Sequence, residues 1–391
     1  MIREFLSRAR NQMASRCSVV KKALSLLLIA MTVASCSEKT PQELFDETKS
    51  GVVLILNEYY YVLKLPNGNS LYFTGIDSDG NLENLALEYS EIKDKKQMMS
   101  GTGFFIDEEG TIMTNRHVAQ PQIDKSAVKD GYNNLVSSIK YIYAAQMRMM
   151  QQQYQELESQ KNDCYGYDYY GNFSQNTEKL QEIESQQSEL EQQYNELSEQ
   201  MESLDDNISL DELKITAVCK IGIAYNNTFV NSVQDFLGKN ECVVVKVSSE
   251  ESTDLALLQL KNKTTPENAY VFNTDGTVQE SPIQKLKHIF DSKKDKGLQI
   301  DQSLYMIGYN AGPTLAATRK GIQVQMTSGK VTQLPDGERV LYSIPTVQGS
   351  SGSPVIDSAG RLVAVNFAKF VGSDNFNFGI PLNKISAFAK R

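Results

Sequence analysis

The chain has 391 residues, of which 40% are hydrophobic and 22% charged, and its formal net charge is −9. This composition is typical of a globular protein with enough chain for one large core or two smaller ones. The negative charge argues against nucleic acid as a partner, because phosphates attract basic proteins.

The first 35 residues have the pattern of an export signal. Most of their charged residues are basic, and an apolar run over 23–34 follows them. The run is too short for a confident membrane-spanning helix but fits the apolar region of a secretory signal peptide. We therefore expect residues 1–35 to be a signal peptide.

The end of this run, Val-Ala-Ser-Cys at residues 33–36, resembles the lipobox of bacterial lipoproteins. In that family the signal is cut before the cysteine, and the thiol is acylated. The resemblance implies lipidation at Cys36, a lipid-anchored tether over 36–46, and a place in the cell envelope, at the periplasmic face or the outer membrane of a Gram-negative bacterium. The alternative is an ordinary cleaved signal peptide with an incidental cysteine.

Three further cysteines, Cys164, Cys219 and Cys242, follow this N-terminal region. An exported protein can form disulfides, and Cys219 and Cys242 lie on apolar runs that would be neighbouring strands. A bridge between them and two buried free thiols are both compatible with the sequence. No Cys-x-x-Cys pair or His/Cys cluster occurs, so we expect no metal site and no cofactor.

Apolar runs bounded by turn residues predict β-strands in the first part of the chain. Glycines and polar residues separate the runs, and a polar segment over 135–210 interrupts their succession. The runs lie at residues 51–56, at 59–74 as a hairpin, and at 100–107, 111–115, 215–223, 242–247 and 255–260.

Residues 135–208 have apolar side chains spaced alternately three and four apart, which is a heptad seam. The seam comprises Tyr143, Met147, Met150, Tyr154 and Leu157 on one arm, and Leu180, Ile183, Gln187, Leu190, Tyr194, Leu197, Met201, Leu204 and Ile208 on the other, with Gln187 as the one polar position. A Tyr-rich stretch over 163–172 separates the arms. We therefore predict an inserted antiparallel α-helical coiled-coil hairpin over about 135–210, with arms of about 30 residues that project roughly 40–45 Å.

Two roles are open for this hairpin. It is either a spacer that packs on itself or an arm for a protein partner or self-association, with exposed tyrosines at the tip. A seam satisfied within the hairpin favours the first role.

Strand patterns return in the last third of the chain and predict a second β-rich unit. A short terminal helix is expected over 382–391. The expected strands lie at residues 304–309, 321–326, 327–331, 340–344, 355–356, 362–370 and 376–380.

Three residues of complementary chemistry stand beside these strands: His117, Asp254 and Ser351. A serine hydroxyl is a poor nucleophile until a base takes its proton, and an imidazole that titrates near neutrality can take it. A carboxylate can then hold the imidazole. We predict these three as catalytic residues, with the N–H groups of Gly349 and Ser351 as an oxyanion hole.

Each of these residues also has a simpler interpretation when taken singly. His117 would be a structural histidine, Asp254 a turn cap, and the loop 349–354 a hairpin turn rich in Gly and Ser. The other histidine, His288, lies in a Lys-rich segment and is expected at the surface.

The motifs around the three residues resemble those of trypsin-like serine proteases of the HtrA/Deg type. Gly-Thr-Gly-Phe at 101–104 with Thr-Asn-Arg-His-Val at 114–118 is similar to the family's His motif. Thr-Asp-Leu-Ala-Leu-Leu at 253–258 resembles its Asp motif. Gly-Ser-Ser-Gly-Ser-Pro at 349–354 resembles its Gly-x-Ser-Gly-x-Pro motif.

The resemblance implies a mostly β protein of two antiparallel β-barrels within residues 47–391. The first barrel would span about 47–265, including the hairpin, and the second about 280–386, with the active site between them. The implied activity is that of a serine endopeptidase, a hydrolase that acts on protein or peptide substrates through an acyl-enzyme. No PDZ-like domain is expected.

The resemblance also implies a substrate pocket walled by Asn366, Phe367 and Ala368. Pro345 stands where a carboxylate would select Lys or Arg, so we expect an uncharged, small or medium apolar residue on the acyl side of the cleaved bond. Ser350 and Ser353 depart from the family's Asn-Ser-Gly-Gly loop and would shift the oxyanion backbone.

Two other functions remain open. The first is a protease-fold binding or scaffold protein with weak or no catalysis, which would use the hairpin to bind a partner. The second is an esterase with the same three catalytic residues.

Overall fold

The computed structural model describes residues 39–204, 208–250, 252–278, 297–369 and 377–390. The predicted signal peptide with its lipobox, Cys36 and His288 lie outside these residues. Within the described part of the chain, no helix combines the length and the apolar character that crossing a membrane requires.

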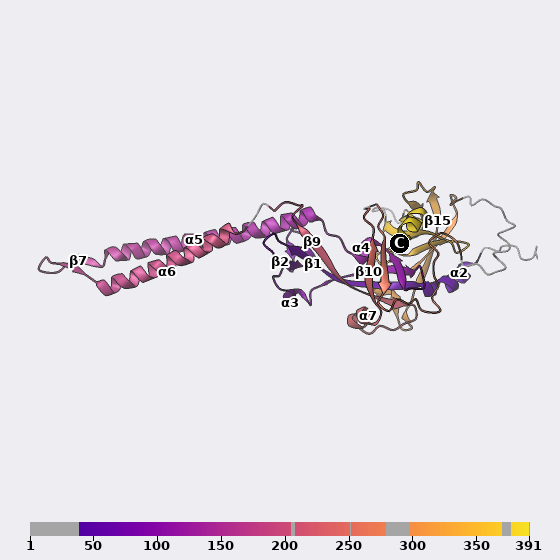
Figure 1. The fold of residues 1–391 in the computed structure, drawn as a ribbon, viewed down its shortest axis with the longest axis horizontal. Helices are drawn as coiled ribbons and strands as arrows, with labels where there is room; N and C mark the ends of the chain where they lie inside the picture. Colours follow the sequence, from indigo (N-terminus) through magenta and orange to yellow (C-terminus); the bar gives the residue numbers. More distant parts are fainter. Residues whose placement is uncertain (1–38, 205–207, 251, 279–296, 370–376, 391) are drawn as a thin grey trace, which may run out of the picture.

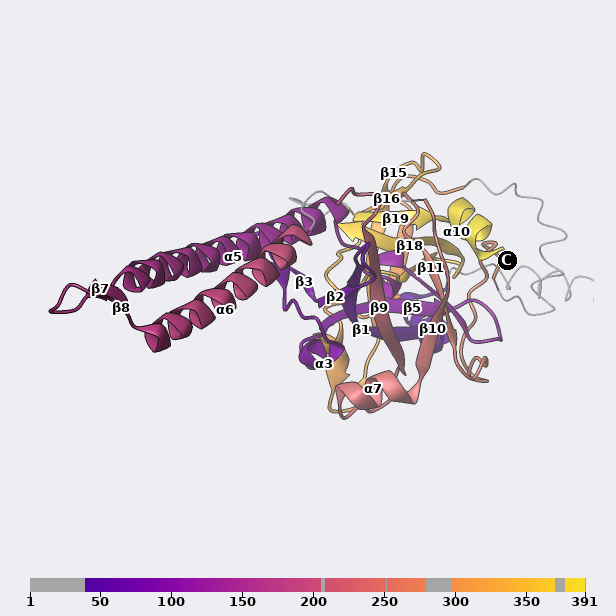
Figure 2. The ribbon, with the colours of Figure 1, turned by 60° about the vertical axis from the view of Figure 1, so that its left-hand side comes forward.

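Two closed antiparallel β-barrels of six strands each form the body of the molecule. Figures 1 and 2 show this β-rich body with the helical hairpin projecting from it. The first contains, in spatial order, β1 (Val52–Lys64), β5 (Gln97–Phe105), β6 (Thr111–Thr114), β11 (Ala256–Leu260), β10 (Glu241–Val247) and β9 (Lys214–Tyr225), which returns to β1. The second contains β12 (Ser303–Gly308), β15 (Gln325–Gln333), β16 (Val340–Tyr342), β19 (Asn377–Pro381), β18 (Leu362–Lys369) and β17 (Pro354–Asp357), which returns to β12. This arrangement confirms the predicted fold class.

The barrels are joined by a shared apolar core. Continuous apolar runs such as the start of β1 are buried on both faces, and their side chains meet those of the second barrel, including Ile307, Ile356 and Val365. Each fully buried side chain of this size stabilises the fold by about 1.5–3 kcal/mol relative to an exposed one. The Tyr309 hydroxyl also donates to the Val52 carbonyl at 3.3 Å. The position of one barrel relative to the other is therefore set by close packing.

Short helices and strands lie outside the two barrels. They are α2 (Pro41–Thr48), β2 (Ser70–Phe73), β3 (Gly75–Ile76), β4 (Leu82–Glu83), α3 (Tyr89–Ile92), α4 (Arg116–Ala119), α7 (Val233–Lys239), α9 (Pro313–Ala316), β13 (Ala317–Thr318), β14 (Gly321–Ile322) and α10 (Leu382–Ala389).

The start of the described chain corrects the extent of the predicted tether, which was expected to run to residue 46. Helix α2 begins at Pro41, and Thr40 caps it through a reciprocal pair of hydrogen bonds with Glu43. Leu44 is fully buried in the shared core. A capped helix with a buried anchor is part of the folded domain, so any tether ends before residue 41.

Strand β1 is longer than the sequence predicted. A strand over 51–56 and a separate hairpin over 59–74 were expected, but β1 runs through 13 residues without a break. Its first part pairs with β5 and its last part with β2, while β9 follows it on the other edge almost throughout. The two long strands therefore leave the barrel together.

A second apolar cluster covers the extension of β1 and β9. It contains Leu63 and Phe73 from the sheet and Val128, Tyr132 and Val136 from a helix that packs across it. This helix is α5 (Lys125–Asn162), which begins ten residues before the predicted start of the insertion. The early start is explained by this packing, since the first turns of α5 cover the sheet.

The inserted helices are α5 and α6 (Thr177–Glu202), which run antiparallel and project from the barrels (Figure 1). Lys161 pairs with Glu184 at 3.2 Å, and Gln187 donates to Glu158 at 2.9 Å. The predicted seam residues are buried or half-buried along both arms. With 38 residues, α5 is about 57 Å long, but its first turns, through Val136, pack on the sheet and only the rest projects.

The three described cysteines are free thiols, so the structure shows no bridge between Cys219 and Cys242. Cys242 lies opposite Ile221 on the neighbouring strand, two residues beyond Cys219. Diagonal neighbours of this kind are about 7–8 Å apart, which is too far for a disulfide without backbone movement.

We predict that these thiols react slowly in the native protein. Burial raises the pKa of Cys242 to about 12, and it also raises the pKa of Cys219, so both stay protonated at neutral pH. Labelling with a thiol reagent at pH 8 should be slow, should accelerate as the pH rises toward 12, and should reach completion in denaturant. Rapid native labelling of Cys242 at pH 8 would contradict the burial.

Candidate active site

His117 and Asp254 are in direct contact. His117 lies in the one-turn helix α4, which begins after Asn115 at the end of β6. The ring Nδ1 lies 2.6 Å from Asp254 Oδ2, and the backbone N–H of His117 donates to Asp254 Oδ1 at 3.0 Å. A carboxylate accepts hydrogen bonds, so Nδ1 carries the proton and Nε2 is left as the basic nitrogen. The structure therefore brings two of the three predicted residues together.

Asp254 also holds the start of the helix through its backbone. Its carbonyl accepts hydrogen bonds from the Asn115 side chain at 2.8 Å and from the Arg116 N–H at 3.2 Å. The His117 side chain is 38% exposed and that of Asp254 only 19%. The imidazole can thus meet a ligand while the carboxylate behind it stays covered.

Asn57 fixes the other end of α4, a role that the sequence did not predict. Its amide donates to the carbonyls of Val118 at 2.9 Å and Ala119 at 3.1 Å. Asn57 is fully buried in β1, directly after an apolar run. A polar residue next to a buried apolar run could have indicated this role for Asn57, because a buried amide needs hydrogen-bond partners.

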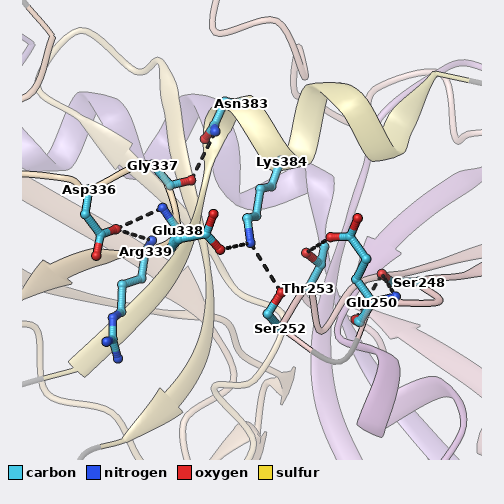
Figure 3. Close-up of polar contacts among 10 residues, drawn as sticks. All are labelled: Ser248, Glu250, Ser252, Thr253, Asp336, Gly337, Glu338, Arg339, Asn383 and Lys384. Carbon is cyan, nitrogen blue, oxygen red and sulfur yellow. Dashed lines mark hydrogen bonds and ion pairs between the residues drawn. The ribbon is translucent and has the colours of Figure 1, made fainter.

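The loop that precedes Asp254 is held from the second barrel, as the close-up in Figure 3 shows. Lys384 projects from α10, and its ammonium group forms an ion pair with Glu338 and donates to the Ser252 hydroxyl at 3.5 Å. The Lys384 side chain is only 13% exposed, whereas that of Glu338 is 67% exposed. Lys384 therefore connects the Asp254 loop to the turn between β15 and β16.

Ser351 lies at the tip of a loop that is tied to the first barrel by Thr102. The Thr102 N–H donates to the Ser351 carbonyl at 2.8 Å, and its hydroxyl donates to the Gly349 carbonyl at 2.9 Å. The same hydroxyl accepts the N–H of Tyr309 at 3.0 Å. Thr102 is fully buried in β5, so these bonds are shielded from water.

Gly352 lets the loop lie directly on the strand that leads to His117. Its φ is +85°, and a Cβ here would lie 2.4 Å from the Thr114 hydroxyl and 3.2 Å from the Asn115 nitrogen. A side chain is thus excluded by both conformation and space. The Ser351 loop and His117 meet at one edge, although these two described residues share no hydrogen bond.

The N–H groups of the loop follow a pattern that fits the predicted oxyanion hole. Ser350 donates to Val347 at 3.0 Å, Gly352 to Asn366 at 2.8 Å and Ser353 to Ser350 at 3.1 Å. Among the described residues, the N–H groups of Gly349 and Ser351 have no acceptor. Two unpaired donors beside a hydroxyl are suited to stabilise a developing oxyanion.

Ser350 and Ser353, which depart from the motif that this loop resembles, are accommodated inside the loop. The Ser350 hydroxyl donates to the Val347 carbonyl at 2.6 Å. Ser353 is fully buried, and its hydroxyl occupies the space where a side chain on Gly308 would lie. With these serines in place, the N–H groups of Gly349 and Ser351 still have no acceptor in the part of the chain that the structure describes.

Asn366 has a different position from the predicted one in the pocket wall. Its side chain is buried, donates to the Ser350 carbonyl at 3.1 Å and accepts from the Tyr342 hydroxyl at 2.8 Å. With these bonds made inside the protein, the buried Asn366 side chain braces the loop. This corrects the substrate-binding prediction for its side chain.

The other two predicted wall residues lie on β18 beside β19. The Phe367 ring is half-buried and lies 6.4 Å from the Phe378 ring, and Ala368 is paired with Phe378 in the sheet. Pro345 is exposed before the loop, and Thr346 behind it donates to Asn377 at 2.6 Å. Among the described residues, no group of three or more His, Cys, Asp or Glu side chains could hold a metal ion.

Residues 221–365 match the family model of the trypsin-like peptidase domain. The matched segment contains Asp254 and the whole Ser351 loop. It covers the end of the first barrel and most of the second, while His117 lies before it. No curated protein matches the chain in sequence.

Two solved structures resemble the chain at low identity. One is the crystal structure of Deg5, with 16% identity and a TM-score of 0.37, covering 90% of this chain and 95% of that one. The other is the serine endoprotease from Yersinia pestis, with 12% identity and a TM-score of 0.38, covering 88% of this chain and 63% of that one. TM-scores below 0.5 do not establish a shared arrangement of the whole chain.

We predict that Thr102→Val destabilises the protein and disorders the Ser351 loop. Valine keeps the shape but cannot bond to the Gly349 carbonyl or the Tyr309 N–H, and each unsatisfied buried group costs about 1–3 kcal/mol. Chemical denaturation should show a lower free energy of unfolding. Thr102→Ser, which keeps the hydroxyl, is the control, and equal loss in both variants would contradict a role for these hydrogen bonds.

We also predict that Lys384→Met impairs the reactivity of Ser351 more than it impairs stability. The change removes the cation that holds Ser252, two residues before Asp254. The rate at which a serine-directed probe labels Ser351 should fall several-fold. Lys384→Arg should restore most of it, and an unchanged rate in Lys384→Met would show that Asp254 is held without this contact.

Proposed function

We propose that this protein is a serine endopeptidase with His117, Asp254 and Ser351 as its catalytic residues. The observation that carries the proposal is the His117–Asp254 contact at the edge where the Ser351 loop is seated. The match of residues 221–365 to the trypsin-like peptidase domain supports the reaction class.

In this proposal each group has one role. Ser351 Oγ attacks the carbonyl carbon of a peptide bond, and His117 Nε2 takes the hydroxyl proton. His117 then delivers that proton to the leaving amine, which breaks the C–N bond and leaves an acyl group on Ser351. A water molecule attacks this ester with His117 again as the base, and the acid product is released.

Two features of the protein lower the barrier of these steps. Asp254 holds the imidazole in the tautomer with Nε2 free and stabilises the imidazolium. The N–H groups of Gly349 and Ser351 stabilise the negative oxygen of the tetrahedral intermediate, and one such donor contributes about 10²–10³ in rate.

We place the enzyme at the bacterial cell envelope, anchored by a lipid on Cys36 and acting on protein or peptide substrates. The lipobox-like sequence at 33–36 supports the anchor. The apolar character of Pro345, Val347 and Phe367 around the loop supports a preference for an uncharged residue on the acyl side of the cleaved bond.

A protease-fold binding protein is the second candidate function. The observation that favours it is the absence of a Ser351–His117 hydrogen bond among the described contacts, together with the large inserted hairpin. An esterase with the same residues is less favoured, because the matched family is one of peptidases.

The first test is labelling of the full chain with a fluorophosphonate probe, which reacts with activated serines. Wild-type protein should be labelled, and Ser351→Ala and His117→Ala should each lose essentially all labelling. Ser358→Ala, in the turn after β17, is the matched control and should label like wild type. A folded wild type that stays unlabelled would favour the binding-protein function.

The lipid anchor predicts a second outcome. Cells that express the protein should incorporate a clickable palmitate analogue into the wild type but not into Cys36→Ser. Cys164→Ser should incorporate it normally, because Cys164 lies in the helical hairpin. Equal incorporation in wild type and Cys36→Ser would exclude acylation at Cys36.

A further inference from the structure

The far end of the hairpin has an exposed aromatic surface, which we call the aromatic tip. It lies on β7 (Tyr165–Tyr167), β8 (Phe173–Gln175) and the turn between them, at the left-hand end of Figure 1. Its members are 43–97% exposed. They are Tyr165, Tyr167, Tyr169, Tyr170 and Phe173.

The tip is not required for packing of the hairpin. Below it, Leu157, Cys164, Leu180 and Ile183 form an apolar cluster of their own between the arms. Figures 1 and 2 both show the tip at the end farthest from the barrels. Five large exposed aromatics at such a place are therefore not explained by the fold, and exposed patches of this kind mark interaction sites.

The turn at the tip is ordered in advance of any partner. Asp168 accepts hydrogen bonds from the N–H groups of Tyr170 and Asn172, both at 2.9 Å, and from the Asn172 side chain at 3.1 Å. The bonds from Asn172 hold the pKa of Asp168 below its ordinary value. The Tyr165 and Phe173 rings stack at 6.1 Å. A preordered surface loses less conformational entropy on binding.

The charge of the hairpin restricts the chemistry of a partner. Residues 149–202 contain twelve acidic and two basic side chains, a net charge of −10, whereas the whole chain has −9. No Lys or Arg lies between Lys161 and Lys179, so the tip itself has only acidic charges. An anionic membrane or a nucleic acid would be repelled, and a basic protein surface would be attracted.

We propose that the aromatic tip binds an arginine-rich surface or segment of another protein. Guanidinium groups stack on exposed tyrosine faces, and the acidic arms below attract the same cations. The tip combines Tyr, Gly, Asn and Ser residues. Such residues form binding surfaces with a large contact area that lose little side-chain entropy on binding. This interaction lies far from Ser351 and does not depend on catalysis.

The chain has no Trp, which allows a specific optical test. Tyr169→Trp places the sole tryptophan on the tip, where Tyr169 is 97% exposed. The full chain with this change is titrated with a peptide of four arginines separated by glycines, with the matching lysine and glutamate peptides, and with vesicles of phosphatidylcholine or phosphatidylglycerol. Phe229→Trp, at a 61% exposed position on the first barrel, is the matched control.

The proposal expects a saturable fluorescence change with the arginine peptide, weaker binding of the lysine peptide, and none of the glutamate peptide. Raising the salt from 50 to 300 mM should weaken binding at least tenfold. Tyr167→Ser with Tyr170→Ser, added to Tyr169→Trp, should weaken it at least fivefold, with helix content unchanged by circular dichroism.

Three results would overturn the proposal. One is the absence of a saturable change with the arginine peptide, and another is an equal change in the Phe229→Trp control. The third is a response to vesicles that exceeds the response to the peptide, which would identify the tip as a membrane contact. Each outcome is read by tryptophan fluorescence and is independent of fluorophosphonate labelling, so it is separable from the proposed protease function.

Discussion

The geometry of the candidate active site depends on the hydrogen bonds of one buried threonine. Thr102 lies on a strand of the first barrel and forms hydrogen bonds to Gly349, Ser351 and Tyr309 of the second. Its carbonyl also accepts the Thr114 hydroxyl at 2.7 Å. The loop with the candidate nucleophile is thus held by the sheet that carries the candidate base. The positions of the Ser351 loop and of His117 therefore both depend on Thr102.

Local sequence patterns predicted most of the fold, because period-two and heptad spacings are properties of neighbouring residues. They failed where tertiary packing decided the result. The extension of β1 beyond the barrel depends on β2 and β9, and the early start of α5 depends on the apolar cluster beneath it. The expected tether ran past the start of helix α2, because one buried side chain, Leu44, is a weak signal in a polar segment.

In the candidate site, too, local sequence patterns predicted some residues and missed those whose role depends on tertiary contacts. His117, Asp254 and Ser351 stood out through their flanking motifs, and the structure joins the first two directly. The residues that support them did not stand out, because each acts across a long sequence separation. Thr102 lies 247 positions from Gly349, and Lys384 lies 132 from Ser252. Asn366 was assigned to the pocket by analogy, yet its partners turn it inward.

The position of the helical hairpin between His117 and Asp254 has a consequence for the order of folding. These residues are 137 positions apart, and closing a flexible loop becomes costlier with its length, by about 0.6 kcal/mol for each doubling. The arms of α5 and α6 are antiparallel neighbours that form from local contacts and return the chain to its starting point. Once the two arms of the hairpin have paired, the flexible chain between His117 and Asp254 is much shorter than 137 residues. The insertion therefore lowers the entropy cost of bringing β6 and β11 together.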